Sequence, residues 1–411
     1  MLMLLERKGM MAEKLLLDGL KVLDVASWIA APVAATMLAD LGADVIKIEL
    51  PGIGDGYRQF GLLPVTPTSD ENYTWQMDAR NRRSLALNLR SDEGRQILQG
   101  MIEECDVYIT NQPLPLRREL KLNYEDLVSV NPRMIYASLT AYGEEGPDRD
   151  YEGFDLVAYW ARSGLMDLVR ERGAPPTPAL PGMGDHPTAV SLYASIMTAL
   201  LRRERTGEGA HVHTSLLHNG IWSASCIAQA KFSEADFSPY RAPERGSYPH
   251  TAFETADGRW LTLTMLRMEG DFDTLMLLLD ATELLVDERF LSTEARLMNA
   301  GAFVDALRPY FARQQSDEFL ARAAEAGLNV VRVGTLDELP DDPQVKLNPM
   351  LLEAEPEVTR YPVIDNPVHV DGLGRAAVTR PPDIGEHTEE ILKERGYDAA
   401  AIERLRDDGV I

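Results

Sequence analysis

The hydrophobic and polar positions in the first part of the chain alternate between two patterns. Short runs rich in apolar residues predict buried strands at residues 21–25, 43–49, 82–89, 106–110 and 134–143. Between them, apolar side chains recur three and four positions apart, which predicts helices at residues 31–42, 91–105 and 124–132. Strands that alternate with helices are typical of β-α-β units, whose strands lie parallel in one sheet. We therefore predict a doubly wound, Rossmann-like α/β fold for residues 20–145.

Capping residues support these boundaries. Pro32 stands near the start of the first helix and Gly42 stands at its end. Ser91 precedes Asp92 and Glu93, so that a hydroxyl can accept a free N–H and the two acids lie at the positive helix end. Farther on, residues 188–206 predict a long helix that ends at Gly207, and residues 210–230 predict a strand followed by another helix.

The pattern changes after residues 232–250, which are polar and contain prolines. An Asp-Gly pair at 257–258 predicts a hairpin, and helices follow near 270–282 and 300–326. Residues 330–339 and the C-terminal stretch predict a return to α/β packing. The expected domains are a large Rossmann-like one over 12–230, a smaller α+β one over 245–325, and a segment, 335–411, that rejoins the large domain.

Charge and cysteine usage restrict the partners and the compartment. Acidic side chains outnumber basic ones by 65 to 41, so that the formal net charge is −24. A surface this acidic argues against nucleic acid or a membrane as a partner. No apolar run reaches the ~18 residues of a membrane span, and the leader MLMLLERKGMM lacks the ending of a signal peptide. Only Cys105 and Cys226 are present, which is too few for a disulfide framework. Together these features predict a cytoplasmic protein.

Several familiar catalytic patterns are missing from the sequence. The first strand-to-helix turn reads DVASWIAAP and lacks the G-x-G-x-x-G fingerprint, which disfavours NAD and FAD. There is no P-loop lysine motif and no G-x-S-x-G nucleophile elbow. His211 and His213 share one face of a predicted strand, but no ligand stands at a suitable spacing, so we expect no metal site. Trp28 and Ile29 lie at a helix N-terminus, which either offers free N–H groups to an anion or is a buried apolar turn.

An arginine cluster stands out in this acidic chain. Its members are Arg80, Arg82, Arg83, Arg90 and Arg95. A guanidinium can bond two phosphate oxygens at once, so the cluster fits an anionic ligand. Arginines on a solvated face also pair with surplus acids. The sequence leaves both interpretations open.

Asp185 is a further candidate for chemistry, because it stands at the start of the long helix. Aspartate is a good N-cap, so the simplest interpretation is a cap. Pro187, however, favours the first helical turn, which makes His186 the cap position and leaves Asp185 just before it. We expect a carboxylate there to be exposed and ionised beside the positive helix end. An ionised carboxylate can attack an activated acyl group.

Five segments stand in order along the chain, namely GLKVLDVASWIAAPVAATMLADLGADVIKIELPGIGD, NRRSLALNLRSDEGR, GFDLVAYWARSGLM, GDHPTAVSLYASIMTALLRRERTGEGAHVHTSL and GEHTEEIL. Together they resemble the class III CoA-transferase family, the CaiB/BaiF or carnitine-dehydratase-like proteins. The resemblance runs from about residue 18 to the C-terminus. It implies a large Rossmann-like domain, a small domain, and a homodimer of two interlocked chains.

In this family the Gly-Asp before the long helix supplies the catalytic aspartate, which matches Gly184 and Asp185. The resemblance implies that the Asp185 carboxylate takes the acyl group of an acyl-CoA and that the CoA thiolate then forms an aspartyl-CoA thioester. A second carboxylic acid repeats the steps in reverse. The implied partners are therefore an acyl-CoA, a carboxylic acid and a second copy of the chain. CoA is a substrate here, and no permanently bound cofactor or metal is required.

The resemblance also implies residues that bind CoA. Arg90 matches a basic residue at a CoA phosphate, and Asn111 and Gln112 fall on a loop that lines pantetheine or adenine. Arg118 stands beside Glu119, where the family has an arginine. The implied set is Trp28, Ile29, Leu87, Asn88, Leu89, Arg90, Asn111, Gln112, Arg118, Phe154 and Asp155.

Substrate class and alternatives rest on a few positions. Ile29 replaces a glutamine of the oxalate-acting members, which disfavours formyl or oxalyl transfer, and YWARSG with GDH is similar to members that act on aryl or branched acids. Four aromatic residues would suit a bulky apolar acid and are equally compatible with a place in the core, namely Trp28, Phe154, Tyr159 and Trp160. Racemases of this family need a histidine in a G-H-D motif, where this chain has Phe154, which cannot transfer a proton. A non-catalytic acyl-CoA-binding protein is the other alternative, and the intact Asp185 argues against it.

Overall fold

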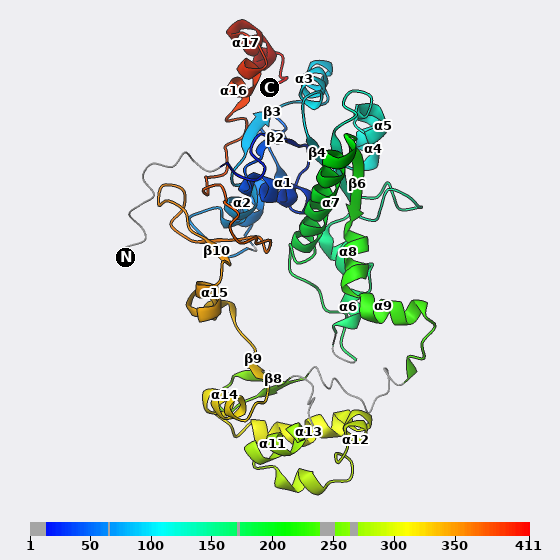
Figure 1. The fold of residues 1–411 in the computed structure, drawn as a ribbon, viewed down its shortest axis with the longest axis vertical. Coiled ribbons are helices and arrows are strands. Elements are labelled where there is room, and N and C mark those ends of the chain that lie inside the picture. The colour runs from blue at the N-terminus through cyan, green and yellow to red at the C-terminus, as the bar shows by residue number, and fades with distance from the viewer. Residues whose placement is uncertain (1–13, 65, 171–172, 239–250, 264–269) are drawn as a thin grey trace. The chain divides into compact units, whose positions relative to one another are not determined.

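The computed structural model describes residues 14–64, 66–170, 173–238, 251–263 and 270–411. By its internal contacts the chain divides into two compact units (Figure 1). The described residues of 1–168, 178–225 and 346–411 form the first unit, and those of 169–177 and 226–345 form the second. The second unit therefore takes up more of the chain than the stretch 245–325 that the sequence predicts.

The first unit is built on a six-stranded parallel sheet. Its strands are β1 (Lys21–Asp24), β2 (Asp44–Glu49), β3 (Arg83–Ala86), β4 (Val107–Thr110), β5 (Ile135–Thr140) and β6 (Ala210–Ser215). They lie in the order β3-β2-β1-β4-β5-β6, and each neighbouring pair is parallel. This order confirms the doubly wound α/β prediction and reverses direction between β1 and β4, where ligands bind in folds of this kind.

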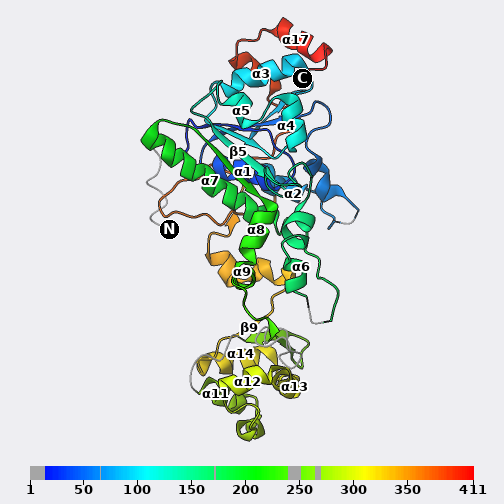
Figure 2. The ribbon, with the colours of Figure 1, turned by 90° about the vertical axis from the view of Figure 1, so that its right-hand side faces the viewer.

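Helices cover both faces of the sheet (Figure 2). One face carries α1 (Ala30–Asp40) and α7 (Asp185–Thr206), and every residue of the alanine-rich α1 is buried. The other face packs Leu23, Tyr108 and Tyr136 against apolar side chains of helices that include both C-terminal ones. The helices of this second layer are α3 (Asp92–Ile102), α4 (Leu114–Leu120), α5 (Tyr124–Leu127), α16 (Thr388–Glu394) and α17 (Ala399–Asp407).

Shorter elements complete the first unit. They are η1 (Gly56–Leu62), α2 (Tyr73–Ala79), the π-helix η2 (Leu156–Ala161), α6 (Leu165–Leu168), α8 (Leu216–Ser223) and the antiparallel pair β10 (Leu351–Leu352) and β11 (Val363–Ile364). Helices α9 (Ser225–Phe232) and α15 (Pro343–Leu347) lie where the chain passes between units. None of the described helices combines the length and the apolar character needed to cross a membrane.

The predicted start of α3 at Ser91 and the predicted end of α7 at Gly207 are confirmed. The Ser91 hydroxyl accepts the Gly94 N–H at 3.0 Å and caps α3. Gly207 ends α7 with a φ of 78°, a left-handed conformation that glycine adopts without strain. Asp185 differs from its prediction, because it is the first residue of α7 and Gly184 occupies the cap position.

The second unit is a three-stranded antiparallel sheet covered by helices. Strands β7 (Ala252–Glu254) and β8 (Trp260–Leu263) form the predicted hairpin around Gly258, and β9 (Val330–Arg332) pairs with β8. Residues 330–332 thus extend this small sheet and do not return to the parallel one, which corrects the prediction for 330–339. The helical segments are α11 (Asp271–Leu278), η4 (Thr282–Val286), α12 (Thr293–Met298), α13 (Ala300–Phe311), α14 (Ser316–Glu325) and η5 (Leu336–Asp341). Leucines and phenylalanines make up most of the core of this unit.

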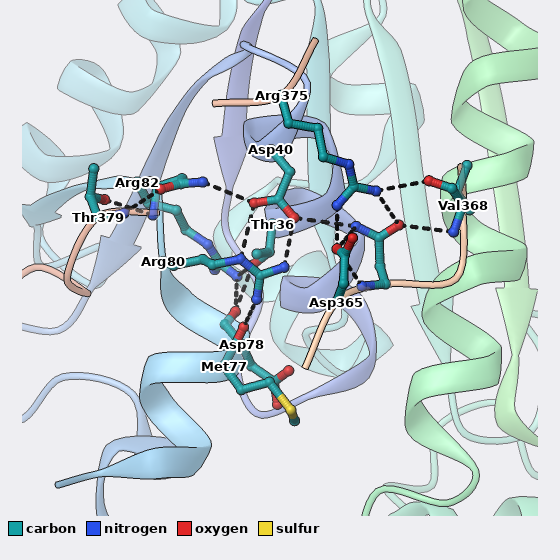
Figure 3. Close-up of polar contacts among 12 residues, drawn as sticks. Thr36, Asp40, Met77, Asp78, Arg80, Arg82, Asp365, Val368, Arg375 and Thr379 are labelled. Carbon is teal, nitrogen blue, oxygen red and sulfur yellow. Dashed lines mark hydrogen bonds and ion pairs between the residues drawn. The ribbon is translucent and has the colours of Figure 1, made fainter. Parts of the chain in front are cut away.

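The C-terminal segment is fastened to the first unit by a polar network (Figure 3). The Arg80 guanidinium donates to Asp40 of α1 at 2.6 Å, and the Asn366 side chain donates to the same carboxylate at 3.2 Å. Arg375 binds the Asp365 carboxylate and donates to the Val368 carbonyl at 2.8 Å. Because the Asp40–Arg80 pair is buried, loss of one partner would leave an uncompensated charge and cost ~3–5 kcal/mol.

Candidate active site

A cavity of about 220 Å³ opens at the carboxyl ends of the central strands. It is lined by residues that follow β1, β2, β3 and β4, which places it at the point where the strand order reverses. Five members of the predicted CoA-binding set line it, namely Leu87, Asn88, Leu89, Arg90 and Gln112.

The cavity wall combines apolar surface with two polar groups suited to a ligand. The Gln112 Oε1 atom is buried and has no hydrogen-bond partner among the described residues. An unpaired buried acceptor is unfavourable, and a ligand N–H would satisfy it. Arg90 lies at the rim with 72% of its side chain exposed, and among the described residues only Glu119, at 3.5 Å, contacts its guanidinium. Leu116 and Leu120 add apolar surface.

Buried charges support the turn that follows β1. The Lys47 ammonium lies 2.7 Å from the Asp55 carboxylate and donates to the Ala26 carbonyl at 2.6 Å. Burial disfavours the charged form of Lys47, but Asp24 and Asp55 outweigh it and raise its pKa. Asp55 in turn accepts the backbone N–H of Trp28 at 3.0 Å. The backbone of this turn is therefore held by charge-assisted hydrogen bonds.

Trp28 has a φ of 67°, which is unusual for a bulky residue and marks a strained turn. Its ring meets the ring of Phe154 edge to face, with centroids 5.1 Å apart. Both side chains are substantially exposed, at 38% and 59%. Two contacting aromatic rings thus present an apolar surface, one from the turn after β1 and the other from the segment before η2.

Gly184 precedes Asp185 in the sequence and contacts Asp155, the residue that follows Phe154. Its N–H donates to the buried Asp155 carboxylate at 3.1 Å. A Cβ at position 184 would meet the Tyr159 ring at 2.6 Å and the Asp155 Cβ at 3.0 Å, so only glycine allows this approach. The Gly-Asp pair therefore has a packing reason: glycine brings the start of α7 against Asp155, and the next residue presents its carboxylate.

The Asp185 carboxylate lies in an unfavourable place for a negative charge. It is partly buried, and burial raises its pKa from 3.8 to about 7, with the charges of Asp155 and Asp78 adding to the rise. His186 and the positive end of α7 oppose the rise. The carboxylate is thus less exposed and less readily ionised than the sequence predicts, because the neighbouring carboxylates and the partly buried position were not visible in the sequence.

His186, Asp78 and Tyr57 form a hydrogen-bonded group beside Asp185. The His186 Nε2 atom lies 3.2 Å from the Asp78 Oδ1 atom, and the Tyr57 hydroxyl donates to Asp78 Oδ2 at 2.6 Å. Burial alone would lower the pKa of His186, but the hydrogen bond and charge of Asp78 raise it to about 9. The sequence does not mark these three as site residues, because they come from α7, α2 and η1 and meet only in the fold.

Other predicted CoA-binding residues have different roles. The Asn111 side chain accepts from the Ser27 N–H at 2.9 Å and donates to the Ser27 carbonyl at 2.7 Å, so it holds the turn and does not line the cavity. Arg118 points to Asp150 at 2.5 Å. Ile29 is a buried residue at the N-cap of α1. Existing partners or packing occupy these three side chains, and their part in CoA binding stays a prediction.

The arginine cluster divides into separate ion pairs. Arg80 binds Asp40, Arg82 binds Asp24 at 2.6 Å, and Arg83 binds Asp44 at 2.6 Å. Arg95 pairs with Asp92 in the same helix. Only Arg90 lines the cavity, so the cluster is mainly a set of structural pairs.

No group of three metal-ligating side chains occurs among the residues that the structure describes. His211 instead lies 3.0 Å from the Ser138 hydroxyl and stacks on Tyr124. Burial raises the pKa of Cys105 to about 12, which suits a packing role, whereas Cys226 is exposed.

Comparison with known proteins identifies a family that this chain matches. A family model described as CoA-transferase family III matches residues 17–388. The chain is 31% identical over 400 residues to the (R)-2-hydroxy-4-methylpentanoate CoA-transferase of Clostridioides difficile, which covers 97% of this chain and 100% of the relative. It is also 31% identical to the cinnamoyl-CoA:phenyllactate CoA-transferase of Clostridium sporogenes, over 95% of this chain and 96% of the relative.

More distant relatives and a solved structure agree. A succinyl-CoA:glutarate CoA-transferase of Mus musculus is 31% identical, over 96% of this chain and 90% of the relative. The crystal structure of a CaiB/BaiF family protein from Brucella suis superposes with a TM-score of 0.78 at 29% identity. That match covers 93% of this chain and 100% of the solved one.

Proposed function

Because the chain belongs to CoA-transferase family III and so is an enzyme that exchanges CoA between an acyl-CoA and an acid, we propose that Asp185 is its covalent nucleophile. The observation that carries this proposal is the partly buried Asp185 carboxylate at the start of α7. A path of contacts joins it to the cavity: Asp55 lines the cavity and holds Trp28, Trp28 meets Phe154, and the adjacent Asp155 binds Gly184.

The reaction follows from carboxylate and thiolate chemistry alone. A carboxylate oxygen of Asp185 attacks the thioester carbon of the donor, the C–S bond breaks, and CoA leaves as thiolate, which gives a mixed anhydride. The thiolate attacks the aspartyl carbonyl and releases the first acid as its carboxylate. The acceptor carboxylate then attacks the aspartyl carbonyl of this thioester, the C–S bond breaks, and CoA leaves as thiolate, which gives a second mixed anhydride. This thiolate attacks the acceptor acyl carbon and forms the product acyl-CoA. This last step frees Asp185, and no proton is gained or lost overall.

The environment of Asp185 suits this role. With a pKa of about 7, the carboxyl is about half ionised near neutral pH and more basic than an ordinary aspartate. A group whose pKa lies near the working pH combines a reactive protonation state with high basicity. The nearby carboxylates of Asp155 and Asp78 that raise this pKa also repel a free anion and favour its transfer into a neutral anhydride or thioester.

The cavity supplies a place for part of CoA. At about 220 Å³ it has room for the adenine ring or a section of pantetheine, and not for the whole molecule. Gln112 Oε1 would accept an N–H of either group. Arg90 at the rim would bind a CoA phosphate, because its exposed guanidinium has only a weak contact with Glu119.

The exposed aromatic pair favours an aryl or branched acyl group. Trp28 and Phe154 offer apolar surface on the path to Asp185, and His186 is the one cation among the charges that shift the pKa of Asp185. A second carboxylate on the substrate would meet Asp155 and Asp78, which disfavours dicarboxylic acids. Two relatives are named for acids of the favoured kind, 2-hydroxy-4-methylpentanoate and phenyllactate.

Hydroxylamine trapping tests the covalent step. Acyl-CoA with hydroxylamine should inactivate the enzyme, because hydroxylamine converts the aspartyl-CoA thioester to a hydroxamate, and peptide mass mapping should place it on Asp185. D185N should lose transfer and trapping together. An acceptor series should favour phenyl-substituted and branched acids over glutarate.

Asp92 provides a matched control, since it is likewise the first residue of a helix and is 89% exposed. D92N should keep full transfer and be trapped like the wild type. Normal transfer by D185N, or a hydroxamate on another residue, would contradict the proposal.

A further inference from the structure

His186 follows the nucleophile directly and is held at both ring nitrogens. Its Nδ1 atom lies 3.0 Å from the Gly182 carbonyl oxygen, and its Nε2 atom lies 3.2 Å from Asp78 Oδ1. Both partners are acceptors. A neutral imidazole carries one N–H and could satisfy only one of them, whereas the imidazolium donates to both. The geometry therefore favours a positively charged ring beside Asp185.

The partner of His186 is itself fixed in place. Asp78 is buried, and its second carboxylate oxygen accepts the Tyr57 hydroxyl at 2.6 Å. Its backbone carbonyl accepts the Thr36 hydroxyl at 2.6 Å and also a hydrogen bond from Arg82 (Figure 3). Asp78 can thus move little, so the imidazolium that it binds keeps one position.

Carboxylates dominate the remaining charges near His186 and Asp185. Helix α2 contributes Asp78, η1 contributes the neutral phenol of Tyr57, and the residue before η2 is Asp155. The only ionisable side chain of α1, Asp40, is paired with Arg80, and α8 carries only His218. The Arg82 guanidinium contacts the backbone carbonyl of Asp78 and is paired with Asp24. His186 is therefore the positive charge that contacts the Asp78 carboxylate and acts on Asp185, within a cluster that also holds the Asp155 carboxylate.

We propose that His186 is a positioning residue that holds a fixed positive charge beside Asp185 and so keeps a larger share of the nucleophile ionised among the neighbouring carboxylates. This role rests on the proposed function of Asp185 but concerns its protonation and not the bond it forms. The ring takes no part in the transfer, since both its nitrogens are engaged by Gly182 and Asp78. It acts through its charge alone.

The charge has a measurable consequence. Removing an opposite charge from beside a carboxyl raises its pKa by about one unit or more. His186→Gln keeps an N–H donor for Asp78 but has no charge, so the acid limb of kcat/KM should move up by about one pH unit. Well above that limb, Asp185 is ionised in both proteins, and their rates should differ by no more than a few-fold.

The experiment compares the pH profile of transfer with a titration that needs no turnover. Infrared difference spectra would follow the protonated carboxyl band of Asp185, identified by its absence from D185N. We expect the band to disappear near pH 7 in the wild type and about one unit higher in H186Q. His186→Lys restores the charge and should restore the wild-type limb. His213→Gln, which changes an exposed histidine on β6, is the matched control and should shift neither readout.

Each outcome decides between roles. An unchanged Asp185 titration in H186Q, or an equal loss of rate at every pH that H186K does not recover, would overturn the proposal and leave His186 a structural residue. His186→Asn gives the same comparison if H186Q does not fold. If the band shifts as expected while D185N still transfers CoA, the charge role stands and the covalent proposal fails.

Discussion

Replacing Asp185 with asparagine should stabilise the folded protein at neutral and alkaline pH while abolishing transfer. Asparagine keeps the size of the side chain and one acceptor oxygen, replaces the other oxygen with an NH2 group, and removes the charge. In the wild type, that charge is partly buried and lies beside Asp155 and Asp78. Burial first, and then the charges of these two carboxylates, raise the pKa of Asp185 to about 7. The folded state is therefore more stable when this carboxyl is neutral than when it is ionised.

The sign and size follow from proton binding. Asp185 keeps its proton up to about pH 7 in the folded chain and up to about 3.8 in the unfolded chain, so within this window the folded state binds more protons. The free energy of unfolding must then fall as pH rises through the window. The difference between about 7 and 3.8 is about 3 units, or at most ~4 kcal/mol. Partial exposure and the lost contact with His186 reduce the expected gain of D185N to ~1–2 kcal/mol.

Urea unfolding of D185N and wild type at a series of pH values, at equal protein concentration, measures this gain. The gain should be near zero at about pH 4 and largest above about pH 7.5, because only there is the wild-type carboxyl ionised. D92N, the exposed first-turn control, should show no such pH-dependent gain. A D185N variant that is less stable than wild type above pH 7, or a gain that is equal at all pH values, would refute the reasoning.

Two further predictions test the cavity and the excluded chemistry. Gln112→Leu and Arg90→Ala should each raise the KM for acyl-CoA several-fold and leave the KM for the acceptor acid nearly unchanged. Arg404→Ala, which removes an exposed arginine that pairs with Glu93 and does not line the cavity, should change neither. Unchanged acyl-CoA binding in calorimetry would remove Gln112 and Arg90 from the site. A 2-methylacyl-CoA incubated with the enzyme in deuterated water should not exchange its α-proton, because Phe154 cannot accept one, and rapid enzyme-dependent exchange would support the racemase alternative.

The architecture of the first unit was predictable because its signals are local. Alternating strands and helices, the Ser91 cap and the Gly207 stop each depend on a few neighbouring residues, and the structure confirms them. The segment 330–339 was assigned wrongly, because β9 is a short apolar run whose partner strand, β8, lies far away in the sequence. A run of this length does not reveal which sheet it joins.

Candidate site residues could be predicted only where a local sequence pattern or the family resemblance pointed to them. Asp185 could be selected from its place before a long helix, and Gln112 and Arg90 from the family resemblance. Asp78 gives no such signal, since in the sequence it is one more acid in an acidic chain. Its importance appears only when the fold places His186 and Tyr57 at its two oxygens.

Unfavourable features of the fold gather along one path from the cavity to Asp185. Trp28 holds a left-handed backbone, and Asp185 carries a partly buried charge. Each is held by a buried group: Asp55, paired with Lys47, binds the Trp28 N–H, and Asp155 binds the N–H of Gly184. A change in the turn after β1 would therefore move the cavity wall and the aromatic surface together. In the proposed mechanism, binding and chemistry therefore share one connected set of buried contacts, and the stability lost at Asp185 maintains the reactive carboxylate at its end.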